Sequence, residues 1–130
     1  MKTAKQIIHG KRKSAIARVH LKPGKGTILV NGLDYKAYFK RKAVAADVVK
    51  PLELTSTLAK YDLVVNVQGG GLSGQAGAVR HAIANALNKT QPETRGILKV
   101  NGYLTRDSRV VQRKMYGHKK ARKSFQFSKR

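Results

Sequence analysis

The stretch YDLVVNVQGGGLSGQAGAVRHAIANALNK, residues 61–89, predicts a strand, a glycine-rich turn and a helix in succession. Residues 61–68 are typical of a strand with one buried face, because Leu63, Val65 and Val67 all point to the same side. From Gln75 to about residue 89, apolar side chains recur at helical spacing, so the helix packs on one side. That apolar stripe consists of Ala76, Val79, Ile83, Ala86 and Leu87.

Strands are also predicted before this stretch. Residues 6–9 indicate a short strand, and residues 15–22 alternate cleanly, with alanine, valine and leucine on one face and Arg18, His20 and Lys22 on the other. A Pro-Gly-Lys-Gly turn then leads to a third strand at residues 27–30. Because the turn is short, we expect the second and third strands to pair as a hairpin.

Helices are predicted at three other places in the chain. Residues 41–50 favour a short helix that ends at Pro51, since proline lacks the N–H that a helix interior needs. Residues 52–60 indicate one or two further helical turns, and residues 92–100 another short helix. The predicted order is β-β-β-α-β-α. It favours an α/β sandwich of the α+β type, in which two layers form from a mixed sheet with helices on one face.

Charge divides the chain into a body and two basic ends. The 28 Lys and Arg residues outnumber six Asp and Glu residues, for a net charge of +22. Residues 1–25 contribute +8, residues 26–105 contribute +5 and residues 106–130 contribute +9. We therefore expect one globular domain over residues 1–105, long enough for a single core, and an extended basic tail over residues 106–130.

The tail itself indicates the kind of partner. Residues 108–130 carry nine Lys or Arg and no Asp or Glu, with too few spaced apolar residues to form a core. Such a segment repels itself, and a dense polyanion is what would hold it in one conformation. The sequence thus predicts nucleic acid as the partner, and the tail as an arm that enters it.

Composition excludes several other classes of protein. The chain has no cysteine, which excludes disulfides and Cys-ligated zinc. No apolar run is long enough for a signal peptide or a membrane span, so we expect a cytosolic protein. The acids are scattered and the four histidines lack metal-ligand spacing, so we expect no catalytic residue, no metal and no cofactor.

The glycine-rich turn has more than one interpretation. Gly69, Gly71 and Gly74 match the dinucleotide pattern G-x-G-x-x-G, and Glu93 follows about 20 residues later. The preceding hairpin pattern argues against a nucleotide-binding βαβ unit. Two interpretations stay open: tight strand-to-helix packing, or an RNA phosphate held by backbone N–H groups near Gly70, Gly71 and Ser73. We expect a branched side chain at position 71 to obstruct close approach.

Clustered cations are the other candidate RNA contacts. Lys11, Arg12 and Lys13 lie together between two predicted strands, and Arg18 continues a basic stripe on the sheet. The Lys40–Lys42 cluster begins a helix, where cations oppose the helix dipole, so phosphate contact is the better interpretation. The remaining candidates for RNA contact are the members of this second cluster and the cations of the tail: Lys40, Arg41, Lys42, Arg106, Arg109, Arg113, Lys114, Lys119, Lys120, Arg122 and Lys123.

Aromatic residues are interleaved with the tail cations. Tyr116 is close in sequence to the body, so packing against the domain or a neighbouring protein is the preferred interpretation for it. For Phe125 and Phe127, packing and stacking on unpaired bases stay open as alternatives.

Several segments together resemble one protein family. They are GKRKSAIARV at 10–19, TILVNG at 27–32, VQGGGLSGQAGAVRHAIANAL at 67–87, LTRDSRVVQRKMYGHKKARK at 104–123 and QFSKR at 126–130. In this order they resemble bacterial ribosomal protein nine of the small subunit. The resemblance implies a fold shared with the second domain of small-subunit ribosomal protein five, with a left-handed crossover that departs from the usual rule.

The resemblance also implies partners. They are small-subunit ribosomal RNA and neighbouring proteins in the subunit head, with peptidyl-site transfer RNA at the end of the tail. That transfer RNA contact maps to Ser128, Lys129 and Arg130. Lys123-Ser124-Phe125 departs from the pattern, because relatives are more often rich in arginine and proline there.

Two other functions remain as alternatives. A DNA-binding architectural protein would also be basic, but the sequence has no helix-turn-helix pattern or evident minor-groove wedge. A small nucleotide-dependent enzyme would use the Gly69–Gly74 turn, but the sequence offers no convincing acidic metal site.

Overall fold

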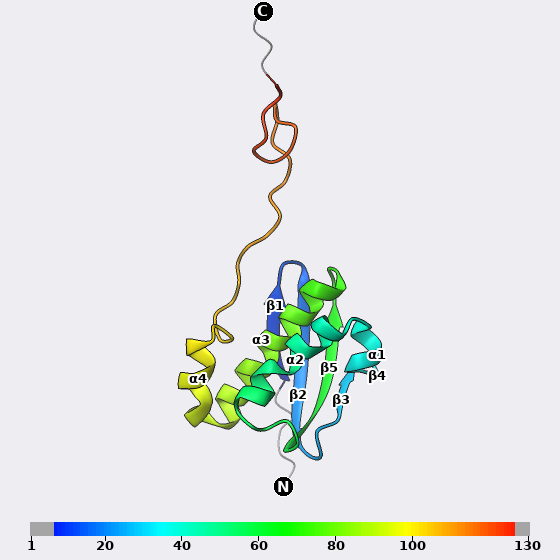
Figure 1. Cartoon of the computed structure of the whole chain (residues 1–130), viewed down its shortest axis with the longest axis vertical. Helices are drawn as coiled ribbons and strands as arrows, with labels where there is room; N and C mark the ends of the chain where they lie inside the picture. Colours follow the sequence, from blue (N-terminus) through cyan, green and yellow to red (C-terminus); the bar gives the residue numbers. More distant parts are fainter. Residues whose placement is uncertain (1–6, 127–130) are drawn as a thin grey trace, which may run out of the picture.

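The computed structural model describes residues 7–126, and it consists of a two-layer body from which a long C-terminal segment extends (Figure 1). One layer is a five-stranded sheet with the strand order β1-β2-β5-β3-β4. The strands are β1 (Ile7–Arg12), β2 (Ala15–Pro23), β3 (Ile28–Val30), β4 (Leu33–Asp34) and β5 (Tyr61–Gln68). The other layer contains α1 (Tyr35–Phe39), α2 (Lys42–Leu54), α3 (Leu72–Thr90), the 3-10 turn η1 (Pro92–Thr94) and α4 (Arg95–Val100).

Strand β5 occupies the centre of the sheet, and this corrects the expected hairpin. β5 pairs antiparallel with β2 and parallel with β3, so β2 and β3 are not neighbours. The Asp62 carboxylate supplies a physical reason. Its Oδ1 accepts the backbone N–H groups of Lys25, Gly26 and Thr27 at 2.9, 3.0 and 2.9 Å, which wraps the turn around the start of β5. Hairpins form instead between β1 and β2 and between β3 and β4.

The connection from β3 to β5 has the unusual hand that the resemblance implied. β3 and β5 run parallel, and α1 and α2 lie between them in the chain. In Figure 1 both strands point upward, β5 lies to the left of β3 and α2 lies in front of the sheet, so the crossover is left-handed. The expected mixed sheet with helices on one face is confirmed.

The core lies between this sheet and the helices. The predicted alternation holds, because Leu63, Val65 and Val67 of β5 are all buried. The predicted apolar stripe of α3 is buried as well. Close contact between the layers depends on Gly10 of β1, where a Cβ would lie 2.3 Å from both the Ala78 carbonyl oxygen and the Ala82 nitrogen of α3. The absence of a side chain at Gly10 thus lets α3 lie directly against β1.

Helix α2 continues beyond the expected stop at Pro51. The ring is buried in the last turn of the helix, which ends at Leu54. Pro51 has no N–H to donate to the Asp47 carbonyl, and the helix continues for only three residues beyond it, where the Thr55 hydroxyl donates to the Pro51 carbonyl at 2.9 Å. Two short elements, β4 and α1, were also missing from the predicted order.

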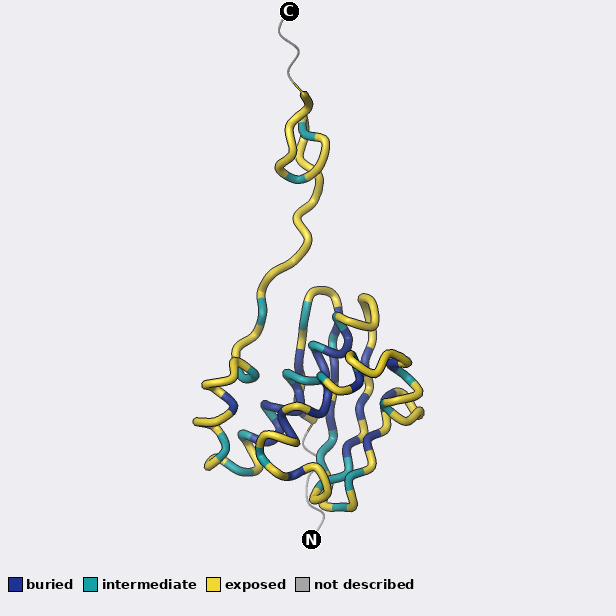
Figure 2. The backbone as a smooth tube through the Cα atoms, in the orientation of Figure 1, coloured by how far each residue is buried: buried dark blue, intermediate teal, exposed yellow. Residues whose placement is uncertain are grey.

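The C-terminal segment has a different character from the body. Residues 106–115 have no regular secondary structure, and nearly every residue beyond 104 is exposed (Figure 2). Further along, an isolated bridge pairs His118 with Ser124, and the Lys119 N–H donates to the Lys123 carbonyl at 2.6 Å. Within residues 7–126, no helix is long and apolar enough to cross a membrane.

Candidate nucleic-acid interface

The glycine turn between β5 and α3 lies against the turn between β1 and β2. Gly69 has φ +82°, and a Cβ there would lie 2.5 Å from the Ser14 carbonyl oxygen. Gly70 also has a positive φ, +66°, which favours glycine. Gly69 thus lets the two turns approach closely, whereas Gly70 is favoured because of its positive φ. This close approach brings Lys13 of the β1–β2 turn beside the start of α3.

Gly71 does not behave as we expected. Its φ is −94°, a conformation that other residues adopt, and a Cβ at this position would meet nothing within 4 Å. The expected obstruction by a branched side chain within the protein is wrong for this glycine. Gly71 instead serves as the N-cap of α3 and leaves open space in front of the helix.

A chain of hydrogen bonds fixes the shape of the glycine turn. The Asn31 side chain bonds both backbone groups of Val67, with both distances 2.9 Å, and donates to the Tyr38 hydroxyl at 3.3 Å. Tyr38 donates to Gln75 Oε1 at 2.6 Å, and Gln75 Nε2 donates to the Gly69 carbonyl at 3.1 Å. The chain ties the end of β3, α1 and the first turn of α3 to the glycine turn.

Sequence reasoning missed Asn31, Tyr38 and Gln75. Asn31 appeared only within the family motif at residues 27–32, and Gln75 only as the first residue of a predicted helix. A buried glutamine at a helix start next to three glycines is the one local signal, since buried amides need partners. One partner, Gly69, is six residues from Gln75, but the other, Tyr38, is 37 residues away, so no local pattern identifies it.

Cations from two other segments meet at the N-terminal end of α3. A shallow exposed hollow is lined by Lys13 and Ser14, by Arg41 and Val44, and by residues 70–74. The first turn of α3 contains no acid, and its N-cap makes no side-chain hydrogen bond. The N–H groups of a first helical turn have no partner within the helix, and the helix dipole adds partial positive charge there. The hollow thus has the electrostatics of an anion site.

The Lys40–Lys42 cluster lies between two hollows. Arg41 lines the hollow at α3 and also a second hollow between α1 and α2, which Lys40 and Lys42 line as well. Arg41 is the N-cap of α2, and no acid lies in the first turn of that helix. Arg41 is therefore the one residue of this cluster that lines the hollow at the glycine turn.

The predicted basic stripe lies on the face of the sheet that the helices leave open. Arg18 is exposed there, with His9 of β1 and Asn66 of β5 as its cross-strand partners. Lys11 is on the same face, opposite Ile16. Arg12 is not, because alternation along β1 turns it to the helix side, where its guanidinium lies 3.8 Å from the Asp107 carboxylate.

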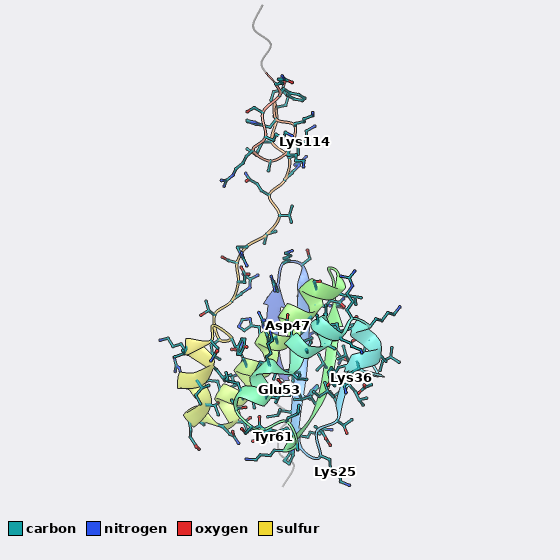
Figure 3. All side chains as sticks on the ribbon, viewed as in Figure 1. Lys25, Lys36, Asp47, Glu53, Tyr61 and Lys114 are labelled. Carbon is teal, nitrogen blue, oxygen red and sulfur yellow. The ribbon has the colours of Figure 1, made fainter. Side chains whose placement is uncertain are left out.

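The predicted tail cations are exposed and lie away from the hollow at α3. Figure 3 shows Lys114 in the extended segment, far from the labelled side chains of the body. Tyr116 is completely exposed, so its ring does not pack against the domain, and packing against a neighbouring protein stays a prediction. Phe125 is also more than half exposed. Phe127 and the terminal Ser128, Lys129 and Arg130 lie outside the described residues.

The enzyme alternative has no geometric support within residues 7–126. Glu93 lies in the exposed turn η1 and not at the end of a second strand, and α3 is followed by η1 and α4 instead of a strand. The described part of the chain also has no group of three His, Asp or Glu side chains that would hold a metal ion.

Comparison with known proteins identifies the family. The model of the family described as ribosomal protein S9/S16 matches residues 10–130. The chain belongs to that family. It is 55% identical over 121 residues to the small ribosomal subunit protein uS9 of Borrelia turicatae (strain 91E135), which covers 93% of this chain and 89% of the relative. The uS9 protein of Borrelia hermsii (strain HS1 / DAH) is similar to the same extent, with 55% identity over 121 residues.

This membership confirms the resemblance that the motifs indicated. The chain is a bacterial small-subunit ribosomal protein, a structural component of the cytoplasmic ribosome and not an enzyme. Ribosomal membership also replaces the DNA-binding alternative.

Proposed function

We propose that the protein binds small-subunit ribosomal RNA through the hollow at the start of α3, the open face of the sheet and the tail, and that the end of the tail contacts peptidyl-site transfer RNA. One observation carries the first part. Lys13 and Arg41 come from segments far apart in sequence, yet both line the hollow at the helix start. Folding thus brings two cations to the N-terminal end of a helix, an arrangement that favours a phosphate group.

The division of labour follows from the structure of the two parts. The folded part of residues 7–105 supplies a shape that positions the protein on folded RNA, and residues 106–130 supply charge at high density. Phosphate contacts contribute affinity without reading sequence, so recognition rests on the shape of the RNA and on unpaired bases. Tyr116 and Phe125 are exposed among cations, which suits stacking on such bases.

The hollow is tested by removing its charge. In the double variant Lys13→Gln/Arg41→Gln, we expect affinity for small-subunit ribosomal RNA to fall roughly tenfold, since two phosphate contacts of modest energy are lost. The matched control is Lys25→Gln, which removes a cation at the opposite end of the body (Figure 3). The double variant removes two cations and the control removes one. If the double variant loses only twice as much binding free energy as Lys25→Gln, net charge alone explains the loss and the hollow has no specific role.

The transfer RNA contact is tested by deleting Ser128, Lys129 and Arg130. Most of the charge lies upstream, so we expect the protein to fold and enter the subunit normally. Peptidyl-site transfer RNA should bind the resulting subunits more weakly by about 1–2 kcal/mol, the size of one or two exposed charged contacts. Filter binding to subunits of equal occupancy measures this, and equal affinities at all salt concentrations would remove the proposed role of the tip.

A further inference from the structure

The root of the tail carries a single acid in an otherwise cationic segment. Asp107 is the only Asp or Glu after Glu93, and ten Lys or Arg residues share residues 106–130 with it. Its carboxylate accepts Arg109 Nε at 3.0 and 3.1 Å, Arg109 Nη2 at 2.8 Å and the Arg109 backbone N–H at 3.0 Å. The side chain of Arg109 lowers the pKa of Asp107 well below its usual range, so the carboxylate stays charged.

Arg12 is the residue of the body that pairs with this carboxylate. Its side chain leaves β1 on the helix side and passes over α3 at Gly77, where a Cβ would lie 2.3 Å from Arg12 Cδ and 2.9 Å from Arg12 Nη1. A glycine inside a helix costs about 1 kcal/mol relative to alanine. The crossing gives a physical reason for this glycine, because any side chain at position 77 would occupy the path of the arginine.

The chain just before Asp107 is also held against the body. Tyr103 and Leu104 pack against the core, and the guanidinium carbon of Arg80 lies 5.3 Å from the centre of the Tyr103 ring. The Tyr103 N–H donates to the Leu98 carbonyl at 3.0 Å. Three of the first residues after α4, at positions 103, 104 and 107, therefore contact the body.

Electrostatics makes the acid at this position consequential. Lys11, Arg12 and Lys13 lie at one end of the body, and Arg106 and Arg109 flank Asp107. Without the carboxylate, these like charges would repel the root of the tail from the body. One exposed ion pair contributes little to stability, but little is needed to bias the direction of a segment whose preceding residues are already packed.

We propose that Asp107, Arg12 and Gly77 form a latch that holds the root of the tail on helix α3 and so sets the direction in which the cationic tail leaves the body. The three are positioning residues. Arg12 and Arg109, both candidates for RNA contact, meet Asp107 in the free protein. The latch does not depend on the proposed RNA contacts, because it acts before any RNA is bound.

The absence of cysteine allows a direct test in the free protein. A nitroxide label on Ser108→Cys should broaden the backbone amide signals of α3 around Gly77. With Asp107→Asn added, we expect the paramagnetic relaxation rates at these amides to fall at least twofold. Gly77→Ala should cause the same loss without changing any charge. The matched control, Asp47→Asn, removes an acid from α2 and should leave the rates unchanged.

A charge swap separates the ion pair from general effects of charge. We expect Arg12→Asp/Asp107→Arg to restore at least half of the broadening that Asp107→Asn removes, whereas Arg12→Asp alone should not. Unchanged rates in both Asp107→Asn and Gly77→Ala would overturn the latch, and so would a swap without rescue. Asp107 is on the surface, so Asp107→Asn will fold, which amide dispersion verifies. RNA affinity measured on the same variants reports separately on the proposed function.

Discussion

The body and the tail of this protein use positive charge in opposite ways. In the body, cations are spread over a surface whose shape is fixed by buried alanine, valine, leucine and isoleucine side chains (Figure 2). In the tail, charge is dense and the described side chains are mostly exposed, with a few local hydrogen bonds near residues 118–124. Packing thus determines where the body's cations lie, whereas we expect the conformation of the tail beyond its root to depend on what it binds.

The comparison also explains why the two parts should fail differently. A substitution in the body acts through packing and changes the free energy of unfolding. We expect a substitution in the tail to remove a proposed interaction with RNA and to leave folding unchanged. The four predictions that follow test this separation, from the largest expected effect to the smallest.

The strongest test removes residues 108–130, which contain nine of the cations. We expect affinity for small-subunit ribosomal RNA to fall about a thousandfold at low salt, or about 4 kcal/mol. The slope of log K against log salt should flatten by several units, since each lost phosphate contact accounts for roughly 0.7–0.9. The Tm of the remaining protein should not change, and a large drop would show that the tail supports the body.

The next test makes the same substitution, glycine to alanine, once in the body and once in the tail. Gly10→Ala should destabilise the body by about 3 kcal/mol, because the new Cβ meets the backbone of α3 and the helix must move away. Gly117→Ala puts the same group in the tail, at φ +77° but with nothing within 4 Å. We expect it to leave the denaturant midpoint unchanged, and comparable losses from both would break the comparison.

A third test asks whether α4 belongs to the body. Leu98 is fully buried, so Leu98→Ala should lower the free energy of unfolding by about 2–4 kcal/mol through lost contacts and a cavity. Val111→Ala, in the tail at 81% exposure, should have no measurable effect. Urea unfolding followed by circular dichroism measures both. An unaffected Leu98→Ala variant would place the boundary between body and tail before α4.

The smallest effect concerns pH. The backbone N–H groups of Thr27, Gly26 and Lys25 lower the pKa of Asp62 in the folded protein. A carboxyl whose folded pKa is depressed contributes stability above its unfolded pKa, and that stability is lost as pH falls through the folded pKa. Between pH 5 and pH 2, we therefore expect the Tm of Asp62→Asn to fall less steeply than that of the wild type. Parallel curves would exclude Asp62 as a source of acid sensitivity.

Much of the fold and part of the candidate interface could be predicted locally. The strands around residues 15–22 and 61–68 and the long helix were visible because burial on one face imposes a period of two or of 3.6 on the sequence. The dense charge of the tail was equally plain. The family motifs identified the protein family because they occur in order over nearly the whole chain.

What the sequence by itself determined is therefore the local elements, the placement of charge along the chain and the family. Only the tertiary structure decided that β5 lies between β2 and β3, that Arg41 joins Lys13 at the start of α3, and that Arg12 turns away from its neighbours toward Asp107. The physical reason is the range of the interactions. A period in the sequence records which face of an element is buried, but the identity of its neighbours depends on contacts between residues tens of positions apart. No local pattern records those contacts.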